Sequence, residues 1–233
     1  MGFGRNYSKK GDHKFFIAIQ THKYSHSFSY QFTKGELSRD QEEAIVTKYI
    51  IDALSGACGI NEGVQDQTPN LRIEKVKAEK SWIKLVDGKI EFISSSNQIP
   101  ELIFPGSFNP LHSGHAEMSE LAEKKTGLSP AYEICIQNAD KPPLSYHEIQ
   151  RTVLQFSQSY DWVLTKAGKF SDKAKLFPNS VFIIGADTLT RMLDEKFYLN
   201  RKDMLDQLDL FNSHNINFLV FGRKINKTFI SLD

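Results

Sequence analysis

The segment from Phe104 to His115 carries the residue types best suited to chemistry: a loop rich in glycine, asparagine and proline, and two imidazoles. Residues 102–104 are apolar and predict a short strand that ends at this loop, and a helix is expected to begin near Gly114. Parallel α/β sheets bind ligands at the carboxyl ends of their strands. The free N–H groups and partial positive charge of a helix start attract anions. The segment therefore predicts a phosphate-binding site.

Two glycines and two histidines support this prediction. Gly106 lets the backbone approach a phosphate closely, and Gly114 leaves room for His112 and His115 at the mouth of the helix. A glycine-rich turn between a strand and a helix can also be only a tight corner. Two imidazoles on either side of a glycine are unusual for such a corner, so phosphate chemistry is the favoured interpretation.

Short apolar strands alternate with helical segments from residue 102 onward. The expected strands are Leu102–Phe104, Tyr132–Ile136, Trp162–Leu164, Val181–Ile184 and Asn217–Phe221. The expected helices are Glu117–Lys125, Ser145–Phe156, Thr188–Leu193 and Met204–Phe211. This alternation predicts an α/β domain over residues 99–233, with a doubly wound parallel sheet.

Residues 1–60 have a different pattern, which predicts a small α+β segment. Two strands are expected at Lys14–Gln20 and His26–Thr33. A helix is expected after Ser38, because Gln41 stands three residues later and completes a capping box. Two strands and one helix bury too little surface for an independent core, so this segment must pack against something else.

Residues 61–98 connect the two parts. The polar stretch 61–80 is interpreted as a linker. Within residues 81–93, Asp87 and Gly88 separate two apolar runs, and this spacing predicts a short β-hairpin.

The decapeptide Gly106–His115 resembles the signature of the nucleotidyltransferase superfamily that carries a His/Thr-x-Gly-His motif. It is most similar to nicotinamide/nicotinate mononucleotide adenylyltransferases and related cytidylyltransferase-like proteins, and the resemblance runs from about Glu101 to the C-terminus. It implies a Rossmann-like fold in which His112 and His115 are catalytic. It also implies nucleotide binding by the residues of this loop: Gly106, Ser107, Phe108, Asn109 and Gly114.

Later segments match the same family in order. Lys141 follows the second strand, where the family has a lysine that reaches the mononucleotide phosphate, and Arg151 matches a family arginine. Gly185 and Asp187 resemble a Gly-x-Asp motif whose aspartate lies beside the nucleotide ribose, and a carboxylate can accept from both ribose hydroxyls. Arg223, after the last strand, is a candidate phosphate contact.

The resemblance implies adenylyl transfer from ATP to nicotinamide or nicotinate mononucleotide, with release of pyrophosphate and with Mg²⁺ accompanying ATP. Two alternatives stay open. One is a CTP-dependent transferase that acts on a phosphorylated small molecule. The other is a nucleotide-binding protein without activity, because the sequence stops at Phe229–Asp233, before the Ile-Ser-Ser-Thr-x-Ile-Arg-like motif of the superfamily.

The N-terminal segment has a resemblance of its own. Lys10–Gln20 and the helix from Arg39 resemble the end of a CinA-type domain, the family of nicotinamide-nucleotide amidases. Only the closing third of that domain is matched and the amidase serine precedes it, so no amidase residue is assigned. A partial domain of this kind exposes a sheet edge, which favours a homo-oligomer.

Composition excludes several classes of protein. The 233 residues are 40% hydrophobic and 24% charged, as is ordinary for a globular chain. With 29 basic and 28 acidic residues, the net charge of +1 lacks the electrostatic drive of a general nucleic-acid binder or a membrane-surface protein. No apolar run approaches a membrane span. Cys58 and Cys135 are too few for a disulfide framework or a four-thiolate zinc site. A cytoplasmic enzyme without a metal site of its own is expected.

Overall fold

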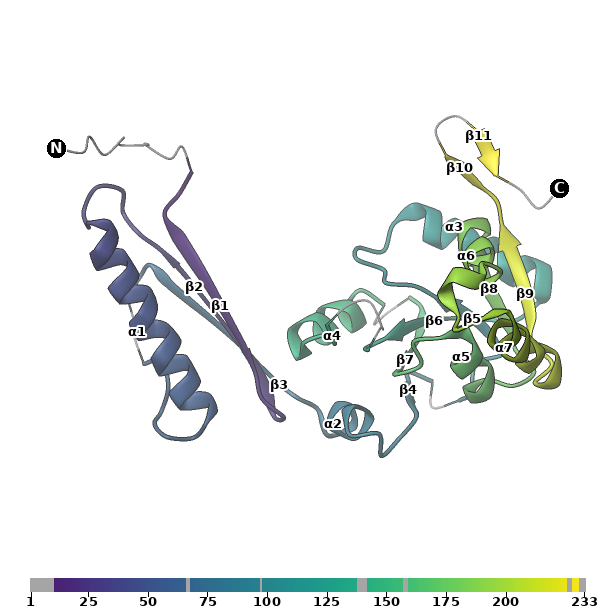
Figure 1. The fold of residues 1–233 in the computed structure, drawn as a ribbon, viewed down its shortest axis with the longest axis horizontal. Coiled ribbons are helices and arrows are strands. Elements are labelled where there is room, and N and C mark those ends of the chain that lie inside the picture. Colours follow the sequence, from purple (N-terminus) through teal and green to yellow (C-terminus); the bar gives the residue numbers. More distant parts are fainter. Residues whose placement is uncertain are drawn as a thin grey trace. The chain divides into compact units, whose positions relative to one another are not determined.

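The computed structural model describes residues 11–65, 68–96, 98–137, 142–156, 159–225 and 228–230, with side chains up to residue 222. The chain divides into two compact units. The first contains the described residues up to Ala78 together with residues 145–147, and the second contains those of 79–144 and from 148 onward. Their helices and strands are labelled in Figure 1. Within the described ranges, no helix has the length and apolar character needed to cross a membrane.

The first unit is a three-stranded antiparallel sheet with one helix. Its strands lie in the order β1 (Lys14–Gln20), β2 (Tyr24–Gln31) and β3 (Leu71–Lys77). Helix α1 (Arg39–Ala57) packs on one face of the sheet (Figure 1). The capping box predicted at the start of this helix is present, with the backbone N–H of Ser38 donating to the Gln41 side chain at 2.9 Å.

Strand β3 lies in the stretch that was predicted to be a linker. It pairs with β2 along its whole length, from Leu71 opposite Tyr30 to Lys77 opposite Tyr24. Most of its side chains are exposed, so its sequence lacks a clear apolar face, and only the pairing with β2 reveals it as a strand. The first unit therefore extends to Ala78. The resemblance of residues 1–60 to a CinA-type domain stays a prediction.

The second unit is built on a six-stranded sheet in the order β4-β7-β6-β5-β8-β9. Five strands are parallel and confirm the predicted doubly wound sheet, and β4 is an antiparallel edge strand. The strands are β4 (Phe92–Ser94), β5 (Leu102–Pro105), β6 (Pro130–Cys135), β7 (Asp161–Thr165), β8 (Val181–Gly185) and β9 (Asn217–Phe221).

Helices connect these strands (Figure 1). They are α3 (Ser113–Thr126), α4 (Tyr146–Leu154), α5 (Phe170–Leu176), α6 (Ala186–Met192), the short 3₁₀ helix η1 (Glu195–Phe197) and α7 (Arg201–Ser213). A two-stranded hairpin follows, β10 (Arg223–Ile225) with β11 (Thr228–Ile230). Helix α5 was not predicted. Its buried face includes Lys173, a residue type that an apolar pattern cannot reveal.

The hairpin predicted over residues 81–93 is wrong. The first apolar run is helix α2 (Lys80–Val86), whose Trp82 and Leu85 are buried three residues apart, at helical spacing. The Asp-Gly pair ends this helix: Gly88 has a φ of +70°, and its N–H donates to the Leu85 carbonyl at 3.0 Å. The second run contains β4, which pairs with β7 instead.

The core of the second unit lies between the sheet and its helices. It contains the buried side chains of Ile103, Val163, Phe177, Phe182, Ile184 and Met192. Most of these come from the central parallel strands, which are buried on both faces and therefore read as continuous apolar runs. This core fixes the positions of the parallel strands, and the loop from Gly106 follows one of them, β5.

Candidate functional site

The sheet order defines a switch point beside β5. From β5 the chain adds β6 and β7 on one side, and then returns to place β8 and β9 on the other. Open α/β sheets bind ligands at the carboxyl ends of strands at such a point. The loop from Gly106 to Leu111 and the start of α3 follow β5 directly, so the predicted phosphate-binding segment lies at this position.

Helix α3 begins with a capping box formed by two histidines. His112 is the N-cap; its backbone N–H donates to Nδ1 of His115 at 3.3 Å, and the backbone N–H of His115 donates to the His112 carbonyl at 2.9 Å. Because Nδ1 of His115 accepts, the proton of its neutral ring lies on Nε2. Burial lowers the pKa of His115, and His112 lowers it further. His115 is therefore a neutral imidazole near pH 7, with Nε2–H as its remaining donor.

The two imidazoles stack on each other, with 3.6 Å between ring centroids and 22° between planes. Gly114 lies against this stack. A Cβ at this position would come within 3.3 Å of two atoms of the His112 ring, closer than most Cβ contacts. The glycine between the histidines thus allows the stacked arrangement, which the sequence analysis did not predict.

Phe108 anchors the loop in the interior. Its side chain is buried, and its φ of +42° lies in the left-handed region that bulky residues rarely adopt. Its ring meets His115 edge-on at 5.0 Å and also contacts Tyr132 at 5.0 Å. A Cβ on Gly106 would lie 2.6 Å from Cζ of Phe108. Gly106 is therefore required by this aromatic ring, a reason that sequence reasoning did not identify.

Gln155 forms two hydrogen bonds with the backbone of the loop from Gly106 to Leu111. Its Nε2 donates to the carbonyl of Phe108 at 2.7 Å, and its Oε1 accepts from the N–H of Leu111 at 3.0 Å. These bonds bracket the Asn109–Pro110 peptide, which is cis. The primary amide is the side-chain group that can donate and accept at once in this way. Gln155 is a positioning residue for the loop, and its sequence context carries no signal of this role.

Replacing Gln155 by methionine is expected to lower turnover about 10- to 100-fold, because a loop misplaced by about 1 Å has effects of this size. Methionine keeps the length of the side chain but neither hydrogen bond. Gln155→Glu keeps the acceptor for Leu111 and loses the donor to Phe108, so its rate is expected to lie between those of the wild type and Gln155→Met. Steady-state pyrophosphate release, the readout of the nucleotidyl transfer that the sequence predicts, measures the series. Equal rates in all three proteins would show that the loop does not need this residue.

Gly185 and Asp187 lie at the end of β8, across the switch point from the loop. Gly185 is the N-cap of α6, and Asp187 lies in the first turn of that helix. A Cβ on Gly185 would lie 2.6 Å from Oδ1 of Asp187. The glycine therefore leaves the space that the Asp187 carboxylate occupies, which links the two residues of the Gly-x-Asp motif.

A cavity of about 530 Å³ opens beside the same loop. Gly106, Ser107 and Asn109 line it, together with Arg151. The two histidines, Phe108, Gly114, Gly185 and Asp187 are not among its lining residues. The predicted residues therefore divide into those that line the cavity and those that do not, and the second group includes the histidines at the start of α3 and Asp187 at the start of α6.

Sequence reasoning missed a buried ion pair in the wall of this cavity. Nζ of Lys173 lies 2.7 Å from each carboxylate oxygen of Glu133, and the Thr165 hydroxyl donates to Oε1 at 2.5 Å. The Glu133 and Lys173 side chains are 1% and 5% exposed. Since the charges of this pair cancel, the net charge of the cavity lining comes from the other charged residues, which are Arg151, Arg191 and Glu148. The positive excess favours an anionic ligand.

Two predicted residues cannot be placed. Lys141 lies outside the described residues, and for Arg223 the structure describes only the backbone, as the first residue of β10. Cys135 lines the cavity, but burial raises the pKa of its thiol, so it stays protonated and does not act as a nucleophile at neutral pH. Among the described side chains, no group of three or more His, Cys, Asp or Glu residues could hold a metal ion.

The fold and the position of the loop define a class of protein: doubly wound α/β proteins, in which ligands bind at the switch point and phosphates bind at helix starts. The model of the cytidylyltransferase-like family matches residues 103–231. The chain belongs to this family, and membership supports nucleotidyl transfer.

One relative extends the comparison. The chain is 30% identical over 142 residues to a protein of Schizosaccharomyces pombe named "Putative nicotinamide mononucleotide adenylyltransferase". The alignment covers 55% of this chain and 55% of that protein, so the chain spans about half the length of the curated relative it matches.

Proposed function

We propose that this protein transfers an adenylyl group from ATP to nicotinamide or nicotinate mononucleotide and releases pyrophosphate. The observation that carries the proposal is the start of α3 at the switch point, where two imidazoles form the helix cap and His115 retains a donor at Nε2. Family membership supports nucleotidyl transfer. The name of the S. pombe relative supports a mononucleotide acceptor.

In this reaction a phosphate oxygen of the mononucleotide attacks the α-phosphorus of ATP in line. One P–O bond forms, the bond from the α-phosphorus to its bridging oxygen breaks, and pyrophosphate leaves with that electron pair. No covalent enzyme intermediate is needed, so the residues serve to position groups and to stabilise charge. His115 Nε2–H and the free backbone N–H groups at the start of α3 donate to phosphate oxygens as their negative charge develops.

The cavity beside the loop is the proposed acceptor site. Its volume of about 530 Å³ is within the usual range for small ligands. Arg151 and Arg191 supply guanidinium groups suited to the acceptor's phosphate. Ser107 and Asn109 line the cavity and precede the helix cap by a few residues, so an acceptor bound here lies next to the start of α3.

Mg²⁺ is proposed to accompany the triphosphate. In proteins this ion commonly keeps several waters and is held through substrate phosphates and one or two carboxylates, so it needs no dedicated protein cage. When bound, Mg²⁺ neutralises charge on the departing pyrophosphate.

A second candidate is cytidylyl transfer from CTP to a phosphorylated small molecule. The description of the matching family, cytidylyltransferase-like, favours it. The same loop, helix start and cavity serve both reactions, because the phosphate chemistry is identical and only the base and the acceptor differ.

Pyrophosphate release by the purified chain separates these functions. ATP and CTP are each offered with nicotinamide mononucleotide, nicotinate mononucleotide and phosphorylated alcohols, and His115→Ala serves as the control. Release with ATP and a mononucleotide, slowed about 10²- to 10³-fold in the control, is the expected result. Release with CTP alone would support the second candidate. Binding of ATP without release from any pair would indicate a nucleotide-binding protein and would overturn both.

A further inference from the structure

The open face of the first unit's sheet carries a concave surface that the proposed transfer reaction does not use. Helix α1 covers the other face, where the Phe15 ring lies 5.6 Å from that of Tyr30 and 5.4 Å from that of Tyr49 in the helix. Side chains alternate along a strand, so Lys14 and Phe16 point away from α1. Phe16 is 71% exposed, which is unusual for a phenylalanine in a folded unit.

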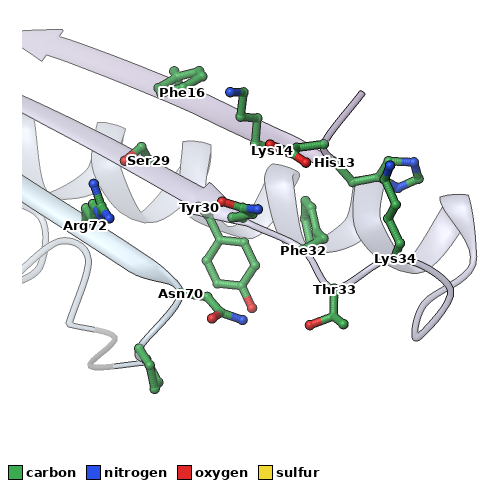
Figure 2. A pocket seen from close by; sticks show the side chains of 13 residues that line it. His13, Lys14, Phe16, Ser29, Tyr30, Phe32, Thr33, Lys34, Asn70 and Arg72 are labelled. Atoms are coloured by element: carbon green, nitrogen blue, oxygen red, sulfur yellow. The ribbon is translucent and has the colours of Figure 1, made fainter. Parts of the chain in front are cut away.

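A row of three residues crosses the sheet at this point. Phe16 of β1 pairs with Ser29 of β2, and Ser29 pairs with Arg72 of β3. Because serine is small, the middle of the row is low and the outer side chains form two walls. Lys14 and Lys34 border the same depression (Figure 2), which has a volume of about 660 Å³. This volume is typical of small-molecule sites.

The depression has a local excess of positive charge. Lys14, Lys34 and Arg72 line it, against one carboxylate, that of Asp12. None of these three cations forms an ion pair with any carboxylate in the described part of the chain. The whole chain has a net charge of only +1, so this excess is a property of the site, and it favours an anionic ligand.

The exposed ring indicates which anion fits. Nζ of Lys14 lies over the Phe16 ring, 5.7 Å from its centroid, so a cation is close to any flat ring that stacks on Phe16. Neighbouring strands are about 4.8 Å apart, which places Phe16 and Arg72 about 10 Å from each other across the row. This span is comparable with the length of a mononucleotide. The side chains of Gln31 and Asn70 also line the depression and offer amide donors and acceptors.

We infer that this depression is a second ligand site, which binds a nucleoside phosphate with the base stacked on Phe16 and the phosphate held by Arg72 and the neighbouring lysines. The site belongs to the first unit, whereas the proposed transfer reaction belongs to the second. It is suited to one nucleotide because the cationic patch is confined to a single depression, whereas nucleic-acid binders need an extended basic surface.

The test is an amide NMR titration of the full chain with AMP. Signals of Ser29, Gln31 and Arg72 are expected to shift and to give a common Kd. Arg72→Gln is expected to raise this Kd about tenfold, the effect of losing one charge-assisted contact. Lys77→Gln, which removes the same charge from the same strand outside the depression, is expected to change it less than twofold. Adenosine and inorganic phosphate are each expected to bind more weakly than AMP.

Several results would overturn the inference. One is an absence of shifts at the three residues, and another is an equal loss of affinity in Arg72→Gln and Lys77→Gln. Inorganic phosphate that binds as tightly as AMP would exclude stacking on Phe16, and a short RNA that binds more tightly than AMP would exclude a mononucleotide site. The titration is repeated with His115→Ala, in which these shifts are expected to persist. This control separates the second site from the transferase site, and failure of the transfer assay leaves the titration unaffected.

Discussion

Replacing His115 by alanine is expected to slow pyrophosphate release about 10²- to 10³-fold, while the second unit stays folded. Loss of one donor that stabilises developing negative charge has effects of this size. In this chain the substitution removes Nε2–H and also the acceptor for the N–H of His112 at 3.3 Å, so the helix cap is lost together with the donor. Steady-state release from ATP with nicotinamide mononucleotide measures the effect.

Two further variants distinguish the loss of the His115 donor from the general effect of removing a histidine ring. His115→Asn keeps one side-chain acceptor and one donor, so it is expected to retain more activity than His115→Ala. His214 lies at the end of α7, where its ring contacts the Leu210 carbonyl, and His214→Ala is expected to keep the wild-type rate within twofold. A rate for His115→Ala within tenfold of wild type would contradict a role for this ring in the reaction.

Replacing Lys173 by methionine is expected to lower the free energy of unfolding of the second unit by about 3–5 kcal/mol. The substitution leaves the Glu133 carboxylate buried without its cation, and breaking a buried pair in this way has a cost of that order. Both tryptophans, Trp82 and Trp162, lie in the second unit. Urea unfolding followed by tryptophan fluorescence therefore measures this unit by itself.

A neighbouring residue of the same helix provides the control. Lys175 lies 4.0 Å from Asp172, and both side chains are at least half exposed, so Lys175→Met is expected to cost less than about 0.5 kcal/mol. Adding Glu133→Gln to Lys173→Met removes the unpaired charge and is expected to restore more than half of the lost stability. If Lys173→Met and Lys175→Met unfold at the same urea concentration, the buried pair does not stabilise the fold.

The five parallel strands of the second unit and four of its helices could be predicted because their signals are local. Short runs of mostly apolar residues, separated by helical segments, indicate buried parallel strands. The five predicted strands all occur. The capping box at Ser38 is equally local, because both of its hydrogen bonds join residues three apart. The segment from Gly106 to His115 also carries its signal in adjacent residues, and its place after a central strand follows from the fold class.

The predictions for residues 61–93 were wrong because the structure of these segments depends on the elements they pair or pack with. Strand β3 has mostly exposed side chains and exists through its ladder with β2, so its sequence resembles that of a linker. The Asp87-Gly88 pair suits a hairpin turn and a helix end equally well, because both need a residue with positive φ. The burial of Trp82 and Leu85 favours the helix over the hairpin.

The sequence by itself thus determined the fold class and the helix start with its two imidazoles, and it predicted the chemistry of these imidazoles. Only the tertiary structure decided how that chemistry is supported. Gln155 meets Phe108 47 residues away, and Lys173 meets Glu133 40 residues away. The physical reason is that capping and periodicity arise between near neighbours, whereas a hydrogen bond or ion pair between distant residues exists only after the sheet has brought their elements together.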